Sequence, residues 1–137
     1  RYGITTNLDY QNTEIGYGDE YNVIIENNLI VAIVKNQEIM LTVRGILQMK
    51  PVKRYIIVDQ NAVLPICNGA NVMSPGIVDA DTEIKKNDFA YVLDVLNRNP
   101  IAVGIAQIDG TEMVKKQPGI ALKNLHHIGD LLWKTRV

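Results

Sequence analysis

The chain has a single cysteine, Cys67, and is poor in the residues that build disulfide-rich or aromatic-rich proteins. Its 137 residues include one Trp and one Phe, and Tyr supplies the other six aromatic side chains. A lone cysteine cannot form an internal disulfide, so a secreted disulfide framework is excluded. A reducing compartment is the expected environment, and we expect the protein to be cytoplasmic.

Long hydrophobic runs are also lacking. Residues 23–34 form the longest apolar window, and a polar Glu-Asn-Asn sequence interrupts it. A membrane-spanning helix needs about 20 predominantly apolar residues, which this window does not supply. A signal-peptide pattern is missing as well. The sequence therefore predicts a protein with no membrane partner.

Motifs that mark common enzymes and metal sites are missing: GxxxxGK[ST], GxGxxG, HExxH, GxSxG and paired CxxC. An enzymatic interpretation rests on Cys67 with His126 or His127, which would have to lie within hydrogen-bond reach. A lone cysteine beside Ile66 on a helix face is more often a small buried hydrophobe. Adjacent histidines point to opposite faces of a strand and cannot chelate one metal ion together. We therefore predict no enzyme, no catalytic residue, no metal site and no cofactor.

The sequence consists mainly of short runs rich in β-branched residues, separated by Asn, Gly and Pro. Residues 27–28 and 36–37 are expected to form tight turns, because Asn tolerates a positive φ. Residues 1–20 show no period and are expected to be irregular, and residues 46–50 allow one or two helical turns. The expected strands cover residues 21–26, 29–35, 38–44, 55–58, 70–73, 89–96 and 101–108, with at least one more in 120–137. This spacing is typical of a small barrel or sandwich.

Two further segments carry helix signals. Asp59 is a candidate N-cap for a helix over residues 60–68, which Gly69 would end. Pro65 lies inside that segment and lacks the backbone donor, so we expect the helix to begin late or to be kinked. A capping-box pattern opens a second short helix over residues 109–116.

The charges nearly cancel in total but are segregated along the chain. The formal net charge is -1, which on its own argues against nucleic acid. Residues 1–43 carry two basic against six acidic side chains, whereas residues 44–54 carry four basic side chains and no acid. Residues 115–137 carry five basic side chains against one acid. If the two basic segments meet, they form a phosphate-sized patch; otherwise they are separately solvated strips.

Three segments together resemble a known family: NGANVMSPGIVD, NPIAVGIAQI and PGIALKNLHHIGDLLW. They resemble the PUA domain, the RNA-binding module of pseudouridine synthases and archaeosine transglycosylases. Within it, the chain is most similar to the malignant T-cell-amplified-sequence and ligatin group of translation factors, as an archaeal-type relative. The matching residues are Gly69, Ala70, Asn71, Met73, Pro75, Gly76, Gly104, Gly119, Asn124, His126, Asp130, Leu132 and Trp133.

The resemblance implies a fold and a domain division. It predicts a mainly β protein of the α+β class, with a PUA pseudo-barrel and short helices in residues 54–137. A small β-rich domain of the pre-PUA kind is expected in residues 1–53. Because PUA folds bring the start of the module beside its last strand, the resemblance also favours one basic face over two separate strips.

The implied function is non-enzymatic RNA binding in translation, during initiation, re-initiation or recycling. The expected partners are structured RNA, either tRNA or rRNA, the small ribosomal subunit and a translation-factor protein, and no DNA is expected. An alternative is an accessory subunit that delivers substrate to an RNA-modifying enzyme. The expected RNA-binding residues are Lys53, Arg54, Asn68, Gly69, Ala70, Asn71, Lys123, His126, Lys134 and Arg136.

Gly69 is the centre of this expected site. A glycine at a helix-to-strand junction lacks Cβ and exposes backbone N–H groups, so a phosphodiester can approach closely. A helix C-cap with positive φ would explain Gly69 equally well, and the two roles are compatible. Trp133 could stack on a base, but its place near the chain end favours packing against the protein.

Overall fold

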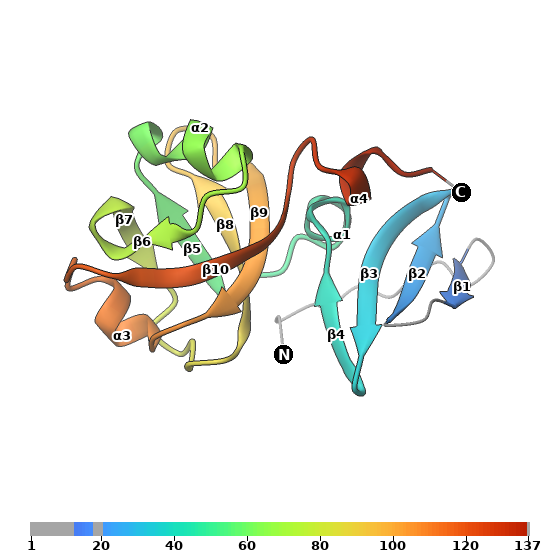
Figure 1. Cartoon of the computed structure of the whole chain (residues 1–137), viewed down its shortest axis with the longest axis horizontal. Helices are drawn as coiled ribbons and strands as arrows, with labels where there is room; N and C mark the ends of the chain where they lie inside the picture. Colours follow the sequence, from blue (N-terminus) through green and yellow to red (C-terminus); the bar gives the residue numbers. More distant parts are fainter. Residues whose placement is uncertain (1–12, 18–20, 137) are drawn as a thin grey trace.

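The computed structural model describes residues 13–17 and 21–136, which form two β-sheets with short helices (Figure 1). The strands are β1 Thr13–Tyr17, β2 Asn22–Glu26, β3 Leu29–Lys35, β4 Glu38–Leu41, β5 Tyr55–Val58, β6 Val72–Met73, β7 Ile77–Ala80, β8 Phe89–Asp94, β9 Pro100–Ala106 and β10 Ile120–His127. The helices are α1 Val43–Met49, α2 Gln60–Cys67, α3 Gly110–Met113 and α4 Leu131–Lys134, with one 3₁₀ turn, Ser74–Gly76. Among these described elements, the helices are all too short to reach across a lipid bilayer.

The first sheet is an antiparallel meander with the order β1-β2-β3-β4. Asn27 and Asn28 join β2 to β3 with φ values of 53° and 67°. Asn36 and Gln37 join β3 to β4 with φ values of 51° and 66°. Two successive positive φ angles are what a primed two-residue hairpin turn requires, so the expected turns are confirmed.

The last strand of this meander is shorter than expected. Residues 38–44 were expected to be extended, but β4 ends at Leu41 and α1 begins at Val43. The Thr42 hydroxyl accepts a hydrogen bond from the Gly45 N–H and donates one to the Ile30 carbonyl. This N-cap satisfies an otherwise orphan helical donor and turns the chain into a two-turn helix.

The second sheet curls into a nearly closed pseudo-barrel, so the expected mainly β pseudo-barrel with short helices is confirmed. Its strand order is β6-β10-β9-β8-β5-β7, and β5 runs parallel to β8. Fully buried aliphatic side chains fill the interior, including Ile56, Ile66, Ile77 and Leu122. Figure 1 shows α2 above this barrel and α3 below it, with the first sheet to one side.

Three local expectations were wrong. The first twenty residues are not wholly irregular, because residues 13–17 form β1; residues 1–12 and 18–20 lie outside the described residues. Residues 77–80 were not among the expected strands but form β7. Its two buried residues, Ile77 and Ala80, flank two exposed ones, so the strand lacks the usual alternation of buried and exposed residues. Helix α3 covers only Gly110–Met113, and the Asp109 carboxylate accepts the Lys86 N–H instead of making a cap bond.

Helix α2 tolerates its proline. The helix runs from Gln60 to Cys67 without the late start that Pro65 suggested. Pro65 is exposed, and its carbonyl still accepts hydrogen bonds from Asn68 and Ala70. One missing N–H on the solvent side of a short helix is therefore tolerated.

The two sheets share an apolar interface. Ala32, Met40 and Ile46 of the first sheet and α1 form one buried cluster with Tyr91 and Val103 from the barrel. The Tyr91 hydroxyl also donates a 2.7 Å hydrogen bond to the carbonyl of Pro51, in the segment that links the two parts. This packing fixes the first sheet against the outer face of β8 and β9.

The chain end leaves the barrel and returns to the first sheet. After β10, residues 128–136 pass over α1 and end beside β2 and β3 (Figure 1). Leu29 of β3 forms an isolated antiparallel bridge with Arg136. Within the expected domain 54–137, Trp133 and Arg136 thus contact α1 and β3, on the first sheet's side of the molecule.

The contact between β9 and β10 requires a glycine at position 104, and this requirement allows a test of the fold. Gly104 pairs with Asn124 next to a register shift in β10, and a Cβ at this position would overlap the carbonyl oxygen of Lys123. We expect Gly104→Ala to lower the free energy of unfolding by about 1–3 kcal/mol or more, measured by urea denaturation. Gly76→Ala is the control, because its Cβ would make an ordinary 3.4 Å contact with Ala62. Equal stability of the two variants would contradict this account.

Candidate nucleic-acid interface

The end of α2 is capped by a Schellman motif centred on Gly69. The Gly69 N–H donates to the Ile66 carbonyl, and the Ala70 N–H donates to the Pro65 carbonyl, each at 3.0 Å. Gly69 has a φ of +98°, as the motif requires at the position after the C-cap. The helix cap expected for Gly69 is therefore present.

This cap changes the expected binding chemistry of the loop. We expected the junction to expose backbone N–H groups, but those of Asn68, Gly69 and Ala70 all donate to carbonyls of α2. They are not free to bind a phosphate. What the loop does offer is an exposed backbone surface at residues 68–70, with no Cβ at its centre.

Asn124 of β10 holds this loop against the barrel. Its Nδ2 donates to the carbonyls of Ile66 and Ala70 at 3.0 and 2.9 Å. Its own backbone N–H donates to Oδ1 of Asn71 at 2.9 Å. The Asn71 carboxamide oxygen is thus used within the protein, so Asn71 acts as a structural link between loop and strand.

His127 lies next to Gly69, and the sequence did not place it in the site. A Cβ built on Gly69 would lie 3.5 Å from Nε2 of His127. The other ring nitrogen, Nδ1, lies 2.9 Å from the Ile128 carbonyl and donates to it. The half-buried His127, rather than His126, therefore shares the surface of the 68–71 loop.

His126, by contrast, faces the interior and is removed from the expected RNA-binding set. Its side chain is 2% exposed, and Nδ1 lies 2.8 Å from Oδ2 of Asp130. Desolvation by burial lowers its pKa, although Asp130 opposes that shift. The sequence carries no local signal for this pair, because a four-residue spacing is typical of paired side chains only on a helix and His126 lies on a strand.

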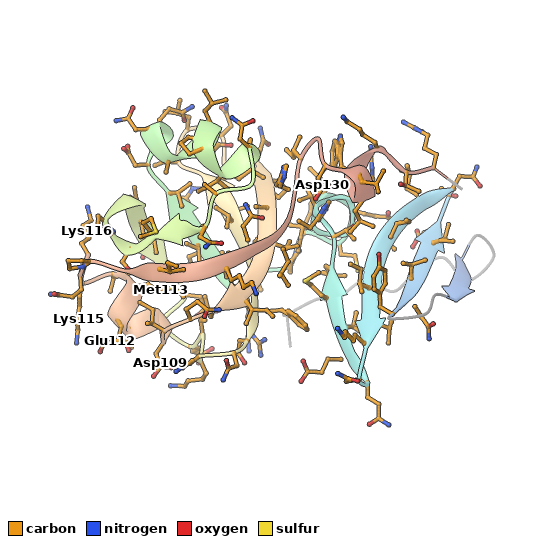
Figure 2. All side chains as sticks on the ribbon, in the orientation of Figure 1. Asp109, Glu112, Met113, Lys115, Lys116 and Asp130 are labelled. Carbon is orange, nitrogen blue, oxygen red and sulfur yellow. The ribbon has the colours of Figure 1, made fainter. Side chains whose placement is uncertain are left out.

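Asp130 fixes the point where the barrel ends, at the junction labelled in Figure 2. It accepts hydrogen bonds from the N–H groups of His127 and Trp133, both at 2.9 Å, in addition to the His126 ring. Burial alone would raise the pKa of Asp130, but these donors outweigh it and hold the pKa below its usual value. The carboxylate caps α4 and orients both histidines.

Trp133 packs against the protein, which was expected in preference to stacking on a base. The Arg44 guanidinium lies 3.8 Å from the centroid of its ring, a cation–π contact. The Arg44 Nε and one terminal nitrogen also donate to the Trp133 carbonyl, at 3.1 and 2.9 Å. The contact joins α4 to α1, so Trp133 links the chain end to the first domain rather than closing the barrel core.

Arg54, expected in a basic patch, is occupied within the protein. Its guanidinium lies 3.7 Å from Asp88, and its backbone N–H donates to the carboxylate of Asp81 at 2.7 Å. Its side chain is 20% exposed. The Asp88 carboxylate therefore offsets part of the charge that Arg54 would offer to a phosphate.

The remaining cations of the expected patch are spread over both parts of the molecule. Lys123 is exposed on β10, and its neighbour Leu122 pairs with Val72, at the end of the 68–71 loop. Lys53 is exposed just before β5, three strands away from β10 in the sheet order. Lys134 and Arg136 are exposed on the chain end beside the first sheet. Of this set, Lys123 is the one whose strand, β10, contacts the loop through the neighbouring residue Asn124.

The other basic pair lies at the far end of the barrel. Figure 2 shows Lys115 and Lys116 beside α3, away from Asp130. Lys115 makes an exposed 3.0 Å ion pair with Glu112. These two lysines form a solvated charged surface, separate from the 68–71 loop.

The enzymatic interpretation depends on the reactivity of Cys67. Burial raises the pKa of the Cys67 thiol, which disfavours the nucleophilic thiolate. A cavity of about 680 Å³ between the two sheets is lined mainly by apolar side chains such as Met40, Phe89 and Leu125, and neither Cys67 nor a histidine is among its described lining residues. Within the described part of the chain, no cluster of three metal-ligating side chains occurs.

Comparisons with known proteins assign the barrel to a family. The PUA domain model matches residues 54–128. An uncharacterized protein of Methanocaldococcus jannaschii is 40% identical over 125 residues, or 91% of this chain and 77% of that protein. A hypothetical protein of Pyrococcus horikoshii has a crystal structure that superimposes with a TM-score of 0.80 at 34% identity, over 89% of this chain and 77% of that one.

Relatives with functional names match the barrel part. Translation machinery-associated protein 20 of Schizosaccharomyces pombe is 34% identical over 82 residues, 57% of this chain and 45% of that protein. A malignant T-cell-amplified sequence 1 homolog of Drosophila melanogaster is 29% identical over 82 residues, 58% of this chain and 45% of its own length. A probable tRNA pseudouridine synthase B of Nanoarchaeum equitans is 39% identical over 74 residues, 54% of this chain and 21% of the enzyme. This chain thus spans less than half of each of these three relatives.

The buried pair predicts a pH dependence of stability. Because burial lowers the pKa of His126, the unfolded chain takes up this proton at a higher pH than the folded protein does. Stability should therefore be fully present above about pH 6.5 and fall as the pH drops below it. Thermal melting of His126→Gln should show a shallower loss in this range than the wild type. Identical slopes for the two proteins would refute the assignment.

The raised pKa of Cys67 predicts slow alkylation. The folded protein should react with iodoacetamide near neutral pH several-fold more slowly than the same chain in urea, because less thiolate is present. Mass spectrometry of the modified chain measures both rates. A faster reaction in the folded state would contradict this prediction and support the hypothesis of an activated Cys67 thiolate.

Proposed function

Since the chain belongs to the PUA-domain family, an RNA-binding fold, we propose that it is a non-enzymatic protein that binds structured RNA in translation. The match of residues 54–128 to this family is the observation that carries the proposal. The relatives named for the translation machinery match this same part of the chain, which supports a role in initiation, re-initiation or recycling. A cytoplasmic location follows from that role.

The proposed RNA surface centres on the exposed loop after α2. Asn68, Gly69 and Ala70 present backbone without a bulky side chain, and Asn124 holds them rigidly against β10. His127 and Lys123 flank them on the same strand. With its N–H groups capped, the loop would recognise RNA by shape and by close approach of the backbone, while Lys123 supplies charge.

The proposed partners are tRNA or rRNA of the small ribosomal subunit, together with a translation-factor protein. The exposed Lys134 and Arg136 on the chain end, beside the first sheet, offer a second basic surface for such an assembly. Their separation from the loop argues that they serve a different contact from the one made by Lys123.

A second candidate is an accessory subunit that presents RNA to a modification enzyme. The similarity to a probable tRNA pseudouridine synthase B over the barrel favours it. The two functions differ in what the protein associates with in cells. Sucrose-gradient fractionation separates them, because a translation factor should comigrate with small ribosomal subunits, whereas an accessory subunit should copurify with a modification enzyme outside ribosomal fractions.

We expect measurable, salt-sensitive binding to tRNA. In fluorescence anisotropy, log K should fall linearly with log salt, with a slope of roughly -1 to -2 for one or two phosphate contacts. Lys123→Glu should weaken binding about three- to tenfold at low salt and reduce the slope by about one. The lost charge beside the loop is the physical reason.

Lys116→Glu is the matched control, because it makes the same charge change at the far end of the barrel. It should retain nearly wild-type affinity. Equal losses in the two variants would indicate a diffuse electrostatic attraction rather than a site at the loop. A dissociation constant for tRNA of about 1 mM or higher at low salt would contradict the proposed function itself.

A further inference from the structure

His127 presents an unused ring nitrogen at the surface of the Gly69 loop. Its Nδ1 is committed to the Ile128 carbonyl at 2.9 Å, whereas Nε2 has no hydrogen-bond partner among the described residues. Unlike Nε2 of His126, this atom is not enclosed by the protein. The space in front of it is open because Gly69 has no side chain, and a Cβ there would lie 3.5 Å away.

The bond to Ile128 decides what this nitrogen can do. A backbone carbonyl is an acceptor, so Nδ1 carries the proton, and in the neutral ring Nε2 is left as an acceptor. A phosphate oxygen is also an acceptor, so the neutral ring offers it no hydrogen bond at this atom. The group that fits Nε2 must bring its own hydrogen.

RNA carries such a donor on its backbone. The ribose 2′-hydroxyl can donate a hydrogen bond, and it is the group by which proteins distinguish RNA from DNA. The loop residues beside Gly69, Asn68 and Ala70, supply no second aromatic ring that could sandwich a base with His127, which favours a contact to the sugar. Trp133 is already covered by Arg44.

We propose that Nε2 of His127 accepts a hydrogen bond from the 2′-hydroxyl of a nucleotide lying over Gly69, which makes His127 a determinant of RNA specificity. This inference rests on the proposed function. It assigns the two neighbouring histidines opposite roles: His126 holds the end of the barrel through Asp130, and His127 reads the sugar. Lys123 adds attraction without distinguishing RNA from DNA.

The test uses a fluorescein-labelled RNA hairpin with an unpaired tail, and versions with single 2′-deoxy or 2′-fluoro substitutions along the tail. Both substitutions remove the hydroxyl donor, and fluorine keeps an electronegative atom of similar size. At one tail position, each should weaken wild-type binding about three- to tenfold, the usual effect of one hydrogen bond. His127→Phe should lose a similar factor with the all-ribose hairpin and show no further loss with the substituted ones.

Non-additivity is the decisive result, because it shows that the ring and the hydroxyl share one interaction. His127→Gln, which retains a side-chain acceptor, should recover part of the sensitivity to the sugar, and thermal melting checks that both variants fold. A sugar penalty that persists in His127→Phe, or a wild-type protein that responds to base changes but to no 2′ substitution, would overturn the role of His127. Failure of the wild type to bind the all-ribose hairpin would instead reject the proposed function.

Discussion

One carboxylate determines how the chain end passes from the barrel to the first sheet. Asp130 accepts hydrogen bonds from the His126 ring and from the backbone N–H groups of His127 and Trp133. The first of these holds the last strand of the barrel, and the last starts α4, whose Trp133 packs on Arg44 of the first domain. Removal of this side chain would release three donors at once, so the path of the chain end and the position of His127 depend on the same group.

The balance of charge takes on a different meaning in the folded protein. The basic segments at 44–54 and 115–137 do not combine into one face, because Arg44 and Arg54 are engaged internally and the remaining cations lie on different elements. A protein with so few free cations at its loop cannot rely on counterion release for strong binding. Its selectivity must come from fit to the backbone of the ligand and from individual hydrogen bonds.

Local chemistry explains which elements were predictable. The Asn27-Asn28 turn and the Gly69 cap follow from residues that tolerate positive φ, and the structure contains both. Strand β7 was missed because its buried residues, Ile77 and Ala80, are three apart and break the period of two. The tertiary context of Asp109, which accepts the distant Lys86 N–H, likewise overrides its local capping signal.

The candidate site was predictable at its centre and not at its edges. The cap at Gly69 was predictable because a glycine directly after a helix is typical of a C-cap with positive φ. His127 was missed because a register shift between Asn124 and His126 decides which histidine faces inward, and no neighbouring residue signals it. The dispersal of Arg54, Lys134 and Arg136 depends on contacts far apart in sequence, so linear charge counts could not anticipate it.

The apolar contact between the sheets restricts how any large ligand can approach. Because Tyr91 and Val103 on β8 and β9 are covered by Ala32, Met40 and Ile46, that wall of the barrel is closed to macromolecules. The first sheet therefore covers the barrel on the side of β8 and β9. In the proposed RNA complex, the bound strand would lie over α2 and β10 instead of over that wall.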